Sequence, residues 1–474
     1  MQTECSASAV EERLSFSKLG HRRVEADFSA GPISSDGGAL LLREADLRVG
    51  LTERLARCFV DHRHPDRIEH SVQQLLTQRI YGLALGYEDL NDHEQLSRDP
   101  LLAAAAGKAD PTGQRRRRER DRGQGLASPS TLGRIDRTLA DANRASRYAK
   151  IVCDFEALGD EFVKLFIERF EQPPERLFLD VDPTDIALHG HQERRFYHGY
   201  YRHHCYLPMY LFCGPYPLAM KLRPSNIDAS SGVIEMLAPV IERLRQKWPT
   251  VHLVVRADSG FCRDELMSFC EQQGVDYVLG LARNKRLTPA IDKQMEQARR
   301  EHLQSGKPTR RFRDFYYRTL TTWSRKRRVV GKAEYTAKGA NPRFVVTSLP
   351  ARHFEKRYLY EELYCARGEM ENRIKEQLSL FGERASCHTF RGNEQRLWWA
   401  MAAHLLIVVL RETGLKKTAM ANAQATTIRT RLLKIGALVK VSVRRLYIRM
   451  STAFPLQALF AQVLRQLQGP EPAT

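Results

Sequence analysis

The sequence predicts a mixed α/β protein in which helical regions flank a central part that contains a sheet. Three observations lead to this prediction. The hydrophobic period is helical at first, changes to a strand-like period near residue 176, and becomes helical again after residue 350. At 474 residues the chain is long enough for two to four domains. With 42% hydrophobic and 28% charged residues it has enough apolar side chains to bury real cores.

The charge balance points to an anionic partner. Lys and Arg number 75 against 56 Asp and Glu, which gives a net charge of +19 and makes nucleic acid the first expected partner. The nine cysteines form no C-x-x-C pair, which predicts a reducing cytoplasm and no zinc finger. The longest apolar stretch, 397–410, is well short of the roughly 20 residues that a membrane span needs. We therefore expect a cytoplasmic protein without a membrane anchor.

The N-terminal region, residues 1–175, is predicted to be helical, because apolar residues recur at helical spacing after Asp36-Gly37-Gly38. Within it, residues 107–130 are rich in Gly, Pro, Ser and Arg and have no hydrophobic period. Six arginines fall between positions 115 and 122. This segment is predicted to be a flexible basic loop inside a region that binds DNA ends.

Residues 176–285 predict a strand, a hairpin, a helix, a strand, a second helix and a further strand, in that order. Together with a helix in residues 351–393, this is the chain order of an RNase H-like domain, which we expect to be catalytic. Residues 286–350 interrupt it and are predicted to form a β-rich insertion. Residues 394–474 are predicted to form a helical, basic C-terminal region.

Three carboxylates occupy positions suited to phosphodiester chemistry. Asp182 ends the first predicted strand, Asp258 ends the fourth, and Glu371 lies on the helix after the insertion. Mg²⁺ prefers oxygen ligands and keeps open positions for phosphate, so such a carboxylate set suits a metal-dependent nuclease site. Each residue alone also fits a strand-ending turn, a helix cap or an exposed helical glutamate. Strand order and net charge together favour the metal site.

The choice among neighbouring residues rests on geometry. Asp180 and Asp182 alternate onto one face of the strand and Asp185 lies just beyond; Asp182 is preferred because it is at the carboxyl end. On the helix, a turn of about 3.6 residues places four side chains on one stripe. They are Tyr364, Arg367, Glu371 and Lys375.

The helix sequence YCARGEME resembles the Tyr-x-x-Arg-x-x-x-Glu signature of bacterial insertion-sequence transposases of the DDE type, in the IS-four-like group with a β-rich insertion. The segments RADSGFCRDEL and YCARGEMENRIKEQ are similar to its IS thirteen-eighty branch, and the similarity runs over most of the chain. The resemblance implies that Asp182, Asp258 and Glu371 are catalytic ligands of Mg²⁺, for which Mn²⁺ substitutes.

The resemblance also implies DNA contacts. Tyr364 and Arg367 would contact phosphate near the cut end. The group carries a lysine seven residues after its glutamate; here that position is Leu378, and Lys375 is the candidate replacement. Trp323 is the candidate for stacking on a flipped base, with a core position as the alternative.

Basic surfaces are predicted in three places. Between positions 307 and 332 ten basic residues are interleaved with aromatics against one acid, a pattern that suits a DNA strand. The candidate contacts there are Arg325, Lys326, Arg327 and Arg328. Residues 415–450 carry nine basic residues and no acid, and Arg115–Arg118 form a third group. Five histidines between 189 and 204 lack zinc-site spacing and are interpreted as structural or phosphate-facing.

These features predict a DNA transposase that cleaves element ends and transfers the 3′-OH into target DNA. Its expected partners are double-stranded DNA, in the form of terminal inverted repeats and target, and a second copy of the chain on that DNA. We expect it in the bacterial cytoplasm, at the nucleoid when bound. A nuclease that never joins strands and a non-catalytic DNA-binding regulator are the alternatives.

Overall fold

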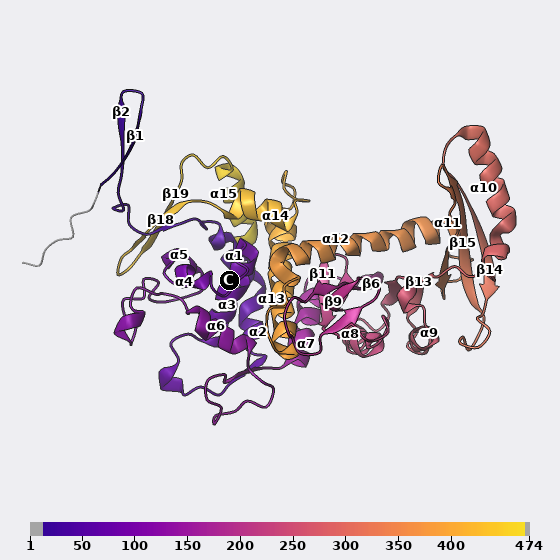
Figure 1. The fold of residues 1–474 in the computed structure, drawn as a ribbon, viewed down its shortest axis with the longest axis horizontal. Helices are drawn as coiled ribbons and strands as arrows, with labels where there is room; N and C mark the ends of the chain where they lie inside the picture. Colours follow the sequence, from indigo (N-terminus) through magenta and orange to yellow (C-terminus); the bar gives the residue numbers. More distant parts are fainter. Residues whose placement is uncertain (1–12, 470–474) are drawn as a thin grey trace, which may run out of the picture.

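One nine-stranded mixed sheet organises the chain in a computed structural model, which describes residues 13–469 (Figure 1). The ends of the two predicted terminal regions, 1–12 and 470–474, lie outside the described residues. Helices cover the sheet and form a separate group at one end. The predicted mixed α/β class is confirmed.

The sheet strands come from the central part of the chain. They are β6 (Arg176–Pro183), β10 (Met209–Cys213), β11 (Tyr216–Lys221), β12 (His252–Ala257), β13 (Asp276–Leu281), β14 (Thr309–Tyr317), β15 (Arg327–Thr336), β16 (Gly339–Ala340) and β17 (Arg343–Thr347). Their order is β11-β10-β6-β12-β13-β17-β15-β14, with β16 paired to β15. β12 is parallel to both β6 and β13, and the other pairs are antiparallel. β12 is buried along almost its whole length, as expected of a central parallel strand with both faces covered.

The predicted insertion is β-rich but does not form a sheet of its own. Its strand β17 pairs with β13, so β17, β15 and β14 extend the sheet of the central region. Helix α10 (Asp292–Ser305) packs against β14 and β15 at the far end of the molecule (Figure 1). Helices α8 (Val233–Lys247) and α9 (Asp264–Gln272) follow β11 and β12, where the sequence predicts them.

The N-terminal region contains short strands as well as helices, which corrects the expectation that it is helical throughout. Its helices are α1 (Ala39–Val49), α2 (Leu51–Ala56), α3 (Val72–Leu85), α4 (His93–Leu96), α5 (Pro100–Ala105), α6 (Pro129–Asp136) and α7 (Phe155–Ile167). Its strands are β1 (Leu14–Leu19), β2 (Arg22–Ala26), β3 (Ile33–Ser34), β4 (Phe59–Asp61) and β5 (Ile151–Cys153). The basic loop 107–130 has only the short 3-10 helix Glu119–Asp121 before α6 begins.

The C-terminal part is likewise not purely helical. Its helices are α11 (Lys356–Tyr358), α12 (Gly368–Gln377), α13 (Phe390–Val409), α14 (Ala425–Ile428) and α15 (Gln457–Gln468). A 3-10 turn, Cys365–Arg367, and π-helical segments at Leu359–Tyr364, Leu378–Gly382, Leu410–Gly414 and Arg429–Leu433 adjoin them. The run predicted as helical forms the hairpin β18 (Ala437–Val441) and β19 (Leu446–Met450), because its β-branched residues alternate with polar ones.

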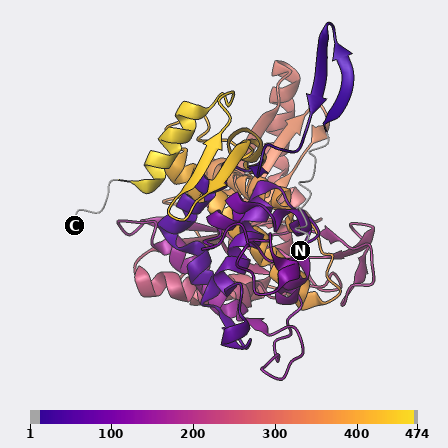
Figure 2. The same cartoon turned by 90° about the vertical axis from the view of Figure 1, so that its left-hand side faces the viewer.

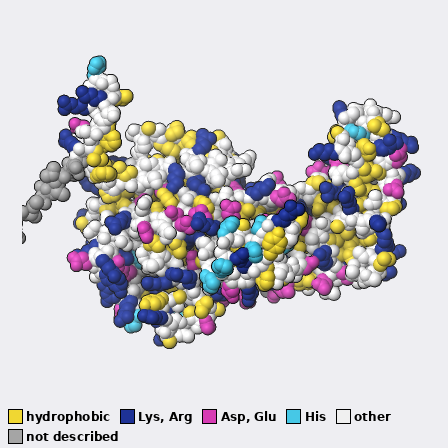
Figure 3. Space-filling model, viewed as in Figure 1, with side chains coloured by type: hydrophobic (Ala, Val, Ile, Leu, Met, Phe, Trp, Pro, Cys, Tyr) yellow, Lys and Arg dark blue, Asp and Glu magenta, His cyan; other side chains and the backbone are white. Residues whose placement is uncertain are grey.

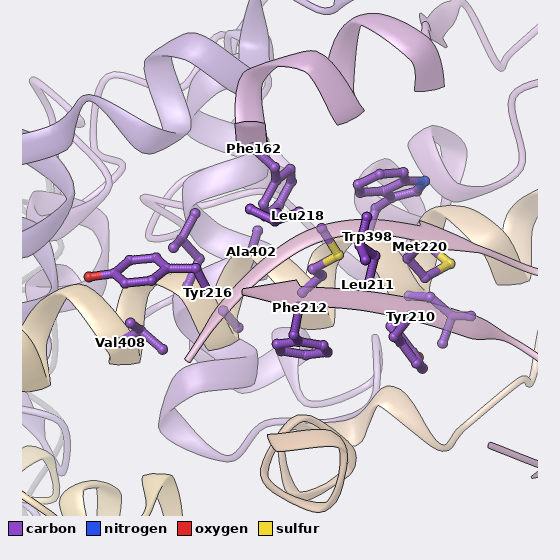
Figure 4. Close-up of a cluster of buried hydrophobic side chains, with 14 of the residues drawn as sticks. Phe162, Tyr210, Leu211, Phe212, Tyr216, Leu218, Met220, Trp398, Ala402 and Val408 are labelled. Carbon is purple, nitrogen blue, oxygen red and sulfur yellow. The ribbon is translucent and has the colours of Figure 1, made fainter. Parts of the chain in front are cut away.

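Helix α13 joins the helical group to the sheet. It is almost entirely buried and packs against α3 on one side and β11 on the other. Trp398 packs on Phe162 of α7, with ring centroids 5.5 Å apart (Figure 4). Trp399 donates its indole N–H to Asp136 Oδ1 at 3.0 Å. The predicted boundary at residues 393 and 394 falls inside this helix, so the two regions share one core.

Segments near the two ends of the described chain meet on the helical group. Figure 2 shows the C-terminal hairpin and α15 beside the N-terminal helices. β3 pairs with β18, and the amide of Gly38 donates to the carbonyl of Leu433 at 3.0 Å. No helix in the described part of the chain is long and apolar enough to cross a membrane.

Replacing Gly38 with alanine tests this junction. The added Cβ would lie 2.3 Å from Leu433 Cα and 2.7 Å from the Leu432 carbonyl oxygen, so backbone would have to move. We expect Gly38→Ala to lower the free energy of unfolding by about 1–3 kcal/mol in denaturant titration. Gly199→Ala is the control, because a Cβ at Gly199 meets nothing within 4 Å. Equal stability of the two variants would contradict the packing described.

Candidate active site

Asp182 and Asp258 lie together where two parallel strands end. Val181 of β6 is the register partner of Ala257 of β12, so the residues that follow them meet at the same edge of the sheet. Asp258 then begins a short 3-10 turn, and its Oδ1 accepts a hydrogen bond from the amide of Gly260 at 2.9 Å. The sequence-predicted pair is therefore positioned by strand register and by a turn.

Glu371 approaches this pair from α12, which packs against β6. Arg367, one helical turn earlier, lies between the carboxylates. Its Nη1 is 3.2 Å from Asp182 Oδ1 and its Nη2 is 3.5 Å from Glu371 Oε1. The Asp182 side chain is 14% exposed and that of Glu371 is 51% exposed. One guanidinium thus links the strand carboxylate to the helix carboxylate.

The electrostatics of the site favour a bound cation. Burial raises the pKa of Asp182 to about 7; the Arg367 charge opposes this shift, and the charges of Asp258 and Glu371 add to it. Three carboxyl groups are therefore crowded here, and one arginine contacts two of them. An added cation would relieve this crowding.

The donor set fits a divalent ion, but the ligands are not already gathered around one point. All three side chains offer carboxylate oxygens, which Mg²⁺ and Mn²⁺ accept. Among residues 13–469, no group of three or more His, Cys, Asp or Glu side chains has a metal-binding arrangement. Since Arg367 contacts two of the carboxylates, three-ligand binding would require its guanidinium to move.

The two neighbouring aspartates, Asp180 and Asp185, form hydrogen bonds with other side chains. Asp180 is buried and forms two hydrogen bonds with Arg256, at 2.6 and 2.7 Å. Arg256 also donates to the carbonyl of Leu363 at 2.8 Å. Asp185 Oδ2 lies 2.9 Å from His203 Nε2. The sequence reasoning missed Arg256, although a charged residue inside the apolar strand VHLVVRAD signals a buried ion pair.

Tyr364 reaches the same edge of the sheet because β13 carries a glycine there. A Cβ on Gly280 would lie 2.6 Å from the Tyr364 hydroxyl and 2.8 Å from the amide nitrogen of Ser259. Burial raises the pKa of Tyr364, so its hydroxyl stays protonated at neutral pH. The side chain lines a cavity of about 370 Å³ beside the Asp258 turn, together with Arg283 and Arg343.

Lys375 lies one turn beyond Glu371 and is exposed. It lines a different cavity, of about 600 Å³, between α12 and residues 421–426. The stripe predicted from the helical period therefore brings Arg367 and Glu371 to the carboxylate site, while Lys375 borders a neighbouring surface.

Two arginines of the predicted DNA surface in the insertion are buried. Arg327 forms ion pairs with Asp264 and Glu271, and Arg328 with Asp314 at 2.8 Å. These ion pairs join β15 to α9 and to β14.

The other three predicted contacts in the insertion divide between core and surface. Trp323 is buried, with its ring edge-on to Tyr317 at 5.6 Å. Stacking of Trp323 on a base would require the ring to leave this position. Arg325 is 60% exposed, although it lies 2.8 Å from Glu271, and Lys326 is exposed. The density of basic residues in the sequence does not show which of them are buried in the core and which are exposed on the surface.

The pKa of Asp182 predicts a pH-dependent stability. Between the ordinary pKa of an aspartate, 3.8, and about 7, the folded protein binds this proton more tightly than the unfolded chain. Wild-type stability should therefore fall as pH rises through that window, by up to about 1.4 kcal/mol per pH unit from this group. In metal-free buffer at pH 8, Asp182→Asn should have a higher melting temperature than the wild type. At pH 5 the difference should be much smaller. Glu369→Gln, exposed on the same helix, is the control; a pH-independent difference for Asp182→Asn would contradict the raised pKa.

Comparisons with known proteins place the chain in a family. A family model described as "Transposase DDE domain group 1" matches residues 16–471. No curated protein matches the sequence significantly. Among solved structures, the chain is similar to the piggyBac transposase in a cryo-EM synaptic complex with hairpin DNA, at 11% identity and a TM-score of 0.41, covering 84% of this chain and 80% of that one. Because the family match spans nearly the whole sequence, the chain belongs to the transposases with a group 1 DDE domain.

Proposed function

We propose that the protein is a divalent-metal-dependent DNA transposase that cuts DNA at the ends of an insertion sequence and transfers the freed 3′-OH into target DNA. The observation that carries this proposal is the position of Asp182 and Asp258 at adjacent strand ends, where Arg367 contacts both Asp182 and Glu371. Family membership supports the reaction class. The strand order β11-β10-β6-β12-β13 supports an RNase H-like catalytic core.

Asp182, Asp258 and Glu371 would hold Mg²⁺, with Mn²⁺ as a substitute. When bound, such ions activate the attacking oxygen and stabilise the leaving oxygen of a phosphodiester. Arg367 neutralises the carboxylates in the ion's absence, and its planar guanidinium suits two-point contact with a DNA phosphate. The Tyr364 hydroxyl, held beside the Asp258 turn, would donate to the same phosphate.

Both chemical steps are substitutions at phosphorus. In cleavage, water attacks the phosphorus at the element end, the bond to the 3′ oxygen breaks, and a 3′-OH is released. In strand transfer, that 3′-OH attacks a target phosphodiester and displaces a second 3′ oxygen. The same side chains can therefore serve both steps in turn.

The remaining contacts follow from charge and exposure. The net charge of +19 suits a double-stranded DNA partner, namely terminal inverted repeats and target. Lys375, Arg325 and Lys326 are exposed for phosphate contact, whereas Arg327, Arg328 and Trp323 would act by holding the insertion in place. Two DNA ends need two active sites, so we propose a homodimer on DNA. The resemblance to the IS-four-like group and its IS thirteen-eighty branch supports a location in the bacterial cytoplasm, at the nucleoid when the enzyme is bound to DNA.

A cleavage and joining assay tests the proposal, with DNA that carries the sequences flanking the gene. Asp182→Asn, Asp258→Asn and Glu371→Gln should each lower Mg²⁺-dependent cleavage and joining by at least about a thousandfold, because each removes a charged ligand. Glu369→Gln is the matched control, since Glu369 is exposed on α12 and pairs only loosely with Arg373 at 3.8 Å. It should retain activity.

The two alternatives give different products. Mg²⁺-dependent hydrolysis without any joined strand would identify a nuclease. DNA binding with no product at any metal concentration would favour a regulator and would overturn the proposed chemistry.

A further inference from the structure

A cavity of about 660 Å³ in the N-terminal region has an unusual charge balance. It lies between the 3-10 helix Pro65–Arg67, the basic loop 107–130 and the beginning of α6. Seven of its lining side chains are arginines and two are carboxylates. Lys and Arg side chains gather at the lower left of Figure 3, over the part of the molecule where Figure 1 places α6.

The carboxylates near the cavity neutralise only some of these arginines. Arg116 is 2.9 Å from Glu69, and Arg63 is 2.7 Å from Asp61 just outside the cavity. Asp121, the second lining carboxylate, lies 3.8 Å from Arg120.

Four lining arginines make no ion pair with any described residue: Arg67, Arg117, Arg118 and Arg134. Of these, Arg117 donates to the Asp66 carbonyl at 2.6 Å, which leaves its charge unbalanced. Like charges gathered this closely repel unless an anion lies among them.

A buried histidine that lines the cavity also lies against positive charges. His70 is buried with Lys108 Nζ 3.1 Å from its Nδ1 and Arg116 against its Nε2. Burial, and then the charges of Lys108, Arg116 and Arg63, lower the pKa of His70 to about 2, so it adds no charge. The Nε of Arg116 is buried and has no hydrogen-bond partner within the described chain.

Helix α6 directs further donors to the cavity. Its N-cap residue, Ser128, makes no side-chain capping bond, and its first turn contains no acidic residue. The hydroxyls of Ser128, Ser130 and Thr131 instead lie 3.2 Å from one another in two pairs and line the cavity. Hydroxyls and a helix N-terminus beside unpaired arginines are what a phosphate group requires.

We propose that this arginine-lined cavity binds the phosphate backbone of DNA at a second place, away from the catalytic carboxylates. A polyanion fits better than a small anion, because the unpaired arginines come from three separate chain segments and successive phosphates can meet them together. α6 lies on the opposite side of α13 from β6, so the contact would hold DNA outside the cutting site (Figure 1). The inference rests on the proposed function, because it presumes DNA as the substrate.

Salt-dependent DNA binding tests the inference. The triple variant Arg67→Ala, Arg118→Ala, Arg134→Ala removes three exposed side chains without leaving a carboxylate unpaired. Binding of the full-length protein to a random-sequence duplex, in EDTA, is measured by fluorescence anisotropy across a salt series. At roughly 0.9 per phosphate contact, the slope of log affinity against log salt should shrink by about 2–3. Replacement of the same three by lysine should restore most of the slope.

The control variant is Lys247→Ala, Lys293→Ala, Lys338→Ala, which removes the same charge from three exposed lysines, on α8, on α10 and between β15 and β16, that make no ion pair with any described residue. It should leave the slope near the wild-type value; an equal loss in both triple variants would overturn the proposal, as it would show only a net-charge effect. Inorganic phosphate provides a second probe: thermal stabilisation by phosphate that disappears in the cavity variant, with the DNA slope unchanged, would identify a small-anion site instead. Backbone binding is measured in EDTA and cleavage in Mg²⁺, so lost backbone binding and lost cleavage are separable failures.

Discussion

The buried ion pair between Asp180 and Arg256 is the interaction on which the candidate site depends. The two residues are register partners on β6 and β12, one pair before Val181 and Ala257 and two positions before the aspartates that end the strands. Burial of such a pair is tolerated only with near-complete hydrogen bonding, which here fixes one register. A slip of one residue would turn Asp182 away from Asp258.

The same arginine connects the sheet to the helix that completes the site. Arg256 donates to the carbonyl of Leu363, immediately before Tyr364 and one turn before Arg367. The helix from residue 359 to 377 is irregular, with π and 3-10 turns before α12, and this contact lies in the irregular part. One buried guanidinium therefore positions both strand carboxylates and, through the backbone, the helix that carries Glu371.

Much of this arrangement was predictable from the sequence. The strands around Asp182 and Asp258 are short apolar runs, and their ends are marked by Pro183 and by Ser259-Gly260. Such local patterns identify elements and their ends but not their partners. The pairing of Asp180 with Arg256 joins positions 76 residues apart, and the cavity brings Arg67 to Arg118 and α6. No local period encodes these contacts.

Burial of charged side chains was the other limit of sequence reasoning. Arg325, Lys326, Arg327 and Arg328 are adjacent in sequence, yet the last two are buried in ion pairs where β15 begins. The acids that pair with them lie on α9 and β14, so their burial depends on tertiary packing. The β18–β19 hairpin was also missed; β18 pairs with β3, a contact between distant parts of the chain that no local period shows.

The proposed reaction requires that Asp182, Asp258 and Glu371 together bind a divalent ion. Anomalous diffraction from crystals of the full chain grown with Mn²⁺ tests it most directly. We expect an anomalous peak in contact with carboxylate oxygens of Asp182 and Asp258, with Glu371 drawn toward it and the Arg367 guanidinium displaced from Asp182. Mn²⁺ peaks only elsewhere, with Arg367 still paired to Asp182, would contradict it.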